Sequence, residues 1–157
     1  MAAYDMEDFF DDLLAFMQDN LNTKIDELNT EKGDTLLQNI ADEAYVFQTL
    51  DNGLVNYDPF LFYGFTILEQ RAEYGFSAKI LQVEVTIIMA ADPSGDDETH
   101  KLLRYSRVLQ ELFEKNWNKV NKRVKLKVTS LEPIGFSLVN SSQPYRAIGV
   151  YLEGALP

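Results

Sequence analysis

The segment from Ser77 to Ala91 constrains the fold more than any other part of this sequence. From Leu81 to Ile87 apolar residues alternate with polar ones. This period of two predicts a long β-strand. Strands that follow one another through short turns pair antiparallel, so we expect a sheet built around this segment.

Two segments with helical spacing of apolar residues lie on either side of that strand. The first spans about Met6 to Leu28, where apolar residues recur three or four positions apart and the acids lie mostly elsewhere. Gly33 is the expected C-cap, and Thr35–Asp42 fits either a short helical turn or a loop. The second helix is expected at about Glu98 to Val120, after a loop at Asp92–Glu98 that is rich in helix breakers and capping residues.

Shorter strand-like segments precede the long strand. Ala44–Leu50 has strand character, and the turn signal at Asp51–Gly53 favours a return strand at Leu54–Tyr57. Phe60–Leu68 is apolar, aromatic and β-rich, whereas the polar Glu69–Gly75 is expected to be an extended connection.

Three strands are expected after the second helix. Val124–Leu131 alternates and is expected to end before Pro133, and two last strands follow at Ile134–Val139 and Tyr145–Leu152. The predicted order is helix, two to four strands, helix, three strands. The chain, residues 1–157, is therefore predicted to be a single α+β domain, with a mostly antiparallel or mixed β-sheet flanked by two main helices at about 6–28 and 98–120.

Composition suits a folded domain and removes several chemistries. The chain has 157 residues, of which 46% are hydrophobic, and no cysteine, so disulfides, zinc–thiolate sites and cysteine nucleophiles are excluded. It has no G-x-S-x-G elbow, P-loop or dinucleotide fingerprint. Its one histidine, His100, is expected to be a solvated helix residue. We therefore expect no enzyme activity and no cofactor.

Neither a leader nor a membrane segment is expected. Residues 1–5 lack the basic and apolar regions of a signal peptide. The longest apolar run, Ile87–Ala91, is too short to cross a bilayer.

Charge is distributed unevenly along the chain. Residues 1–98 carry 21 acids and 4 bases, a net of −17, whereas residues 99–157 carry 4 acids and 10 bases, a net of +6, which together give −11. The acidic part of one copy is suited to contact the basic part of the next, or the two parts neutralise each other within one subunit. The overall acidity argues against a dedicated nucleic-acid binder and against an anionic membrane partner.

The acids Asp92, Asp96, Asp97 and Glu98 are weak candidates for a metal site. Calcium favours several carboxylates on a glycine-containing loop, but the spacing here does not match an EF-hand. Carboxylates at a helix N-terminus are also the ordinary capping arrangement, and we expect that role here.

Charged residues supply the candidates for protein contacts. On the first helix these are Asp11 and Asp12. The one basic cluster surrounds Trp117 and comprises Lys115, Lys119, Lys122, Arg123, Lys125 and Lys127. This cluster fits a patch for phosphate or for an acidic protein surface, with protein contact favoured, or else a solvated face that balances the acidic part.

The aromatic residues between positions 57 and 76 are more numerous than one small core needs. They are Tyr57, Phe60, Phe62, Tyr63, Phe65 and Phe76. Core packing and a role for some of them in an interface, where aromatic residues are enriched, are both open.

The order, size and composition of the segments form a pattern that covers nearly the whole chain. An acidic amphipathic helix is followed by a β-rich middle and a strand ending in VEVTIIMA; an acidic loop, the helix THKLLRYSRVLQELFEKN and the closing segment SLEPIGFSLVNSSQPYRAIGVYLEG come next. This layout resembles the tail-terminator, or tail-to-head joining, proteins of long-tailed bacteriophages.

The resemblance implies a small α/β domain that assembles into a hexameric ring at the head-proximal end of the tail tube. Such a ring stops tube polymerisation and offers the head connector a docking surface, while DNA passes through its lumen without specific binding. It implies a virion protein, present in the host cytoplasm during assembly, with tail-tube and neck proteins as partners and no catalytic residues or cofactor. The alternatives are another phage neck or tail-tube component, or a small-ligand or metal-binding domain that uses Asp92–Glu98.

Overall fold

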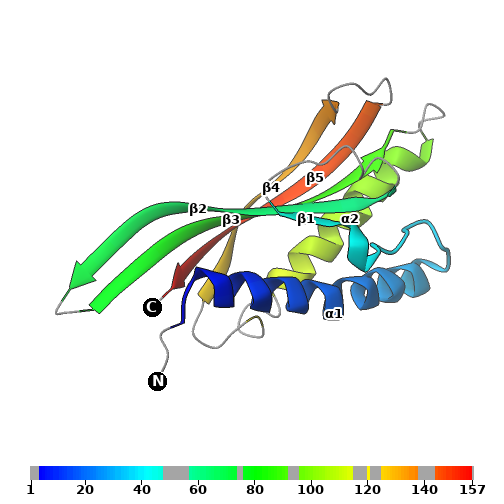
Figure 1. Ribbon diagram of the computed structural model, residues 1–157. Coiled ribbons are helices and arrows are strands. Elements are labelled where there is room, and N and C mark those ends of the chain that lie inside the picture. The colour runs from blue at the N-terminus through cyan, green and yellow to red at the C-terminus, as the bar shows by residue number, and fades with distance from the viewer. Residues whose placement is uncertain are drawn as a thin grey trace.

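A computed structural model describes residues 4–47, 57–73, 76–91, 96–114, 120, 125–137 and 144–156. These residues form two α-helices and a five-stranded mixed sheet with the strand order β1-β2-β3-β5-β4. Both helices lie against the same face of the sheet and contact each other (Figure 1). The predicted α+β class, a sheet accompanied by two main helices, is confirmed.

The chain order of the elements explains the strand order. The elements are α1 (Met6–Lys32), the 3-10 helix η1 (Asp42–Ala44), β1 (Tyr45–Phe47), β2 (Phe60–Glu73), β3 (Phe76–Ala90), α2 (Asp96–Glu114), β4 (Lys125–Ser137) and β5 (Pro144–Leu156). Strand β1 is parallel to β2, and the other neighbouring strands are antiparallel. Because α2 carries the chain across the sheet, β4 lies at the edge and β5 returns between β3 and β4.

Local chemistry sets both ends of α1. The Asp5 carboxylate accepts a hydrogen bond from the Asp8 N–H, and the Asp8 carboxylate accepts one from the Asp5 N–H, which makes a capping box. Gly33 has a φ of 72° and caps the other end in the left-handed conformation, as predicted. The helix therefore continues to Lys32, four residues beyond the predicted end.

The segment between α1 and η1 is extended and is held by side chains rather than by a neighbouring strand. Asn29 donates to the Leu37 carbonyl at 2.9 Å and accepts from the Leu37 N–H at 3.1 Å. Asn22 bonds Ile40 in the same way, at 2.9 and 2.8 Å. The two asparagines are seven residues apart and so share one side of α1. They satisfy backbone groups that an extended segment otherwise leaves without partners.

Helix α2 also contacts this segment, through the side chain of Tyr105. The Tyr105 hydroxyl accepts from the Gln38 N–H at 3.1 Å and donates to the Gln38 carbonyl at 2.8 Å. Tyr105 is buried, and this burial raises the pKa of its hydroxyl well above the ordinary value. One tyrosine therefore ties this segment to α2.

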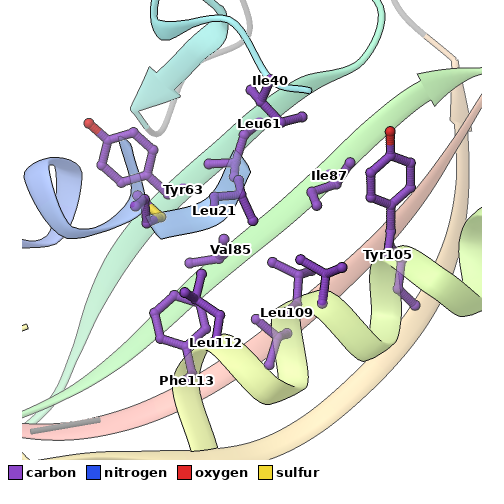
Figure 2. Packing of buried hydrophobic residues seen from close by; sticks show 14 of the residues in the cluster. Leu21, Ile40, Leu61, Tyr63, Val85, Ile87, Tyr105, Leu109, Leu112 and Phe113 are labelled. Carbon is purple, nitrogen blue, oxygen red and sulfur yellow. The ribbon is translucent and has the colours of Figure 1, made fainter. Parts of the chain in front are cut away.

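The core fills the space between the helices and one face of the sheet (Figure 2). Side chains alternate along a strand, so every second residue of β2 and β3 points to the helices. The predicted strand is confirmed, with Leu81, Val83, Val85 and Ile87 buried and Gln82 exposed, but the intervening Thr86 is buried as well. Aromatic rings connect the elements. The ring centroids of Phe9 in α1 and Phe65 in β2 are 5.0 Å apart, and those of Phe16 in α1 and Phe113 in α2 are 6.0 Å apart.

Strand β2 is longer than the sequence predicts. Glu69–Glu73, expected to be a connection, continues β2 and pairs with β3, after a register shift between Ile67 and Glu69. Hydrogen bonding to β3, rather than apolar content, makes this polar stretch a strand, because strand preference depends strongly on context.

Strand β4 also differs from the prediction. Pro133 does not separate two strands: β4 continues through it, with Pro133 opposite Ile148 of β5. An edge strand tolerates a residue without an N–H, because the missing donor can face away from the ladder. A register shift lies between Val128 and Ser130. In the described part of the chain two strands therefore follow α2, and the prediction of a strand break at Pro133 was wrong.

Smaller differences concern element boundaries. Helix α2 begins at Asp96 rather than Glu98. Strand β1 is described at Tyr45–Phe47, inside the predicted Ala44–Leu50, and residues 48–50 of that prediction lie outside the described residues. The predicted turn at 51–53 lies outside the described residues, as does the return strand except for Tyr57, which lies in a bend.

Candidate interaction surfaces

Some bases of residues 99–157 form ion pairs with acids of residues 1–98 within the same subunit. From α2, Arg104 bonds both carboxylate oxygens of Asp34, at 2.7 and 2.8 Å. Arg107 contacts Glu31, at the end of α1, through two N–H groups at 2.9 and 2.8 Å. These hydrogen bonds hold the pKa of Asp34 and of Glu31 below the ordinary values. The basic side of α2 therefore pairs with the C-terminal end of α1, as one of the two sequence alternatives expects.

The rest of α1 keeps an acidic surface. Four exposed acids have no ion pair or hydrogen-bond partner for their side chains among the described residues: Glu7, Asp11, Asp19 and Asp26. Their spacing places them within about a third of the helix circumference. Asp12, the other predicted contact residue on this helix, is half-buried and accepts a hydrogen bond from the Tyr4 hydroxyl at 2.9 Å.

The acids predicted as a loop cluster belong mostly to the first turn of α2. Asp92 lies outside the described residues, Asp96 begins the helix, and Asp97 is exposed. Glu98 forms an ion pair with Arg146 of β5 at 2.8 Å. The described ranges contain no group of three or more His, Asp or Glu side chains that could hold a metal ion. Carboxylates in this turn are favoured by the positive end of the helix dipole.

The predicted basic cluster is described only at its C-terminal end. Lys115, Lys119, Lys122 and Arg123 lie outside the described residues. Lys125 and Lys127 lie in edge strand β4, opposite Ala155 and Glu153 of β5. The structure therefore places two of the six bases, both near one end of the sheet.

Most of the predicted aromatic group packs inside the domain. Phe60 and Tyr63 are buried, and Phe62 and Phe65 are half-buried. Burial raises the pKa of Tyr63 to about 12, and the carboxylate of Asp11 adds a smaller contribution in the same direction. Core packing, one of the two open roles, therefore accounts for these four residues.

A polar hollow of about 570 Å³ lies beside the N-terminal half of α2. It is lined by Asp34, Gln38, Asp97, His100, Lys101 and Arg104, among others. His100 is exposed on the helix, as expected. Because the walls carry both signs of charge, the hollow favours no single class of charged ligand.

Two edges of the sheet have no neighbouring strand among the described residues. In the described part of the chain, β1 pairs with β2 at Leu61–Tyr63, and no described strand pairs with the same side of β2 beyond Tyr63. No described strand pairs with the outer side of β4. Ile67 and Leu68 of β2 are 52% and 53% exposed. Sequence reasoning missed this surface, because an apolar run does not reveal that its strand lies at an edge.

Comparison with known proteins adds no assignment to these surfaces. A scan against protein-family models gives no match for this chain, and a search of curated proteins gives none. Among the described helices, none combines the length and the apolar character needed to cross a membrane.

Proposed function

We propose that the protein is a structural virion component that forms a hexameric ring at the head-proximal end of a phage tail tube. In this role the ring stops tube polymerisation and provides the surface on which the head connector docks. DNA passes through its lumen without specific binding. The protein acts through contacts with its own copies, with the tube protein and with neck proteins, and it needs neither a catalytic residue nor a cofactor.

The observation that carries this proposal is the segregation of charge on the folded chain. The acids along α1 remain exposed, whereas the arginines of α2 neutralise only the C-terminal end of α1 and its cap. Lys125 and Lys127, the two described bases of the predicted cluster, lie on β4. Contacts between unlike surfaces of identical subunits form a ring when the rotation between neighbours closes, so a chain with an acidic helix and a cluster of bases elsewhere in its sequence suits this assembly.

The acidity of the surface also suits passage of DNA. The exposed acids of α1 and a net charge of −11 repel the phosphate groups of DNA. They therefore disfavour binding of the DNA backbone, which basic residues promote by releasing counterions. The resemblance in segment order set out above supports the same role.

The decisive experiment is deletion of the gene from its phage, followed by electron microscopy of the particles. We expect tails of irregular length that are not joined to heads, and wild-type protein supplied in trans should restore normal virions. Normal tails joined to heads would refute the proposal. Immunogold label along the whole tube, rather than at its head-proximal end, would instead identify a tube component.

A matched pair of variants tests the acidic surface in that complementation assay. Asp11→Asn with Asp19→Asn raises the net charge by two on the acidic side of α1 and should restore virions poorly. Asn20→Lys with Thr23→Lys raises it by the same amount at exposed positions outside the acidic sector and should restore them well. Equal restoration by the two variants would exclude the acidic surface from assembly.

A further inference from the structure

We draw no further inference here: the strongest candidate, the exposed apolar pair Ile67 and Leu68 on strand β2, carries none because nothing in the described part of the chain shows what covers it.

Discussion

Asn22 gives the sharpest test of how the extended segment is held to α1. Its side chain makes two hydrogen bonds to the backbone of Ile40, a residue whose side chain is fully buried. Each such bond contributes about 1 kcal/mol net, so Asn22→Ala loses roughly 2 kcal/mol of unfolding free energy. Alanine also favours the helix over asparagine by about 0.6 kcal/mol. The expected net loss is therefore about 1.4 kcal/mol.

Asn20 provides the matched control on the same helix. Its side chain bonds only the Phe16 carbonyl within α1, so Asn20→Ala gains the same helix preference and loses no tertiary contact. The two variants should differ by about 2 kcal/mol in urea unfolding with equal m-values, which corresponds to roughly 4–8 °C in Tm for a chain of this size. A difference below about 0.5 kcal/mol would show that water replaces Asn22 and refute the reasoning.

The other predictions concern the C-cap, the core and two titrations. Gly33→Ala should cost about 1 kcal/mol from its positive φ alone, since nothing lies within 4 Å of an added Cβ, and Gly33→Asn should cost less. Phe113→Ala should cost about 3–5 kcal/mol by urea unfolding because it opens a cavity in the core of Figure 2, against less than about 0.5 kcal/mol for the exposed Leu103→Ala. The lowered pKa of Glu31 contributes stability above the unfolded value of 4.5, so the stability lost in Arg107→Gln should shrink as the pH falls below that value; a constant difference would contradict it. The raised pKa of Tyr63 contributes stability that is complete below the unfolded value of 10.0 and is lost as the pH rises toward about 12, so Tyr63→Phe should flatten the alkaline unfolding curve.

Local signals in the sequence predicted the elements well where backbone chemistry decides them. Gly33 was identified as a C-cap because a left-handed residue after a periodic helix has a glycine signature. The long alternating strand was identified because burial on one face leaves a period of two. The errors lay where a neighbour decides: Glu69–Glu73 is a strand because β3 pairs with it, and Pro133 is tolerated because β4 is an edge.

The surfaces were harder to predict than the elements. The acids of α1 were recognised, but not that Arg104 and Arg107 neutralise only one end of the helix. The residues that hold the extended segment, Asn22 and Asn29, were missed, although their seven-residue spacing on one helix side was visible. A side chain that bonds a distant backbone leaves no period in the sequence.

The sequence by itself determined the class of fold, the positions of the two main helices and of the long strand β3, and the uneven distribution of charge. Each of these depends on a residue and its near neighbours along the chain. Only the tertiary structure decided which acids stay exposed and which strands lie at the edges of the sheet. The strand order places β1 and β4 at opposite edges, and that order follows from the helical crossover between β3 and β4. The place of a strand in the sheet is a relation between segments that are far apart in the chain, so no local pattern specifies it.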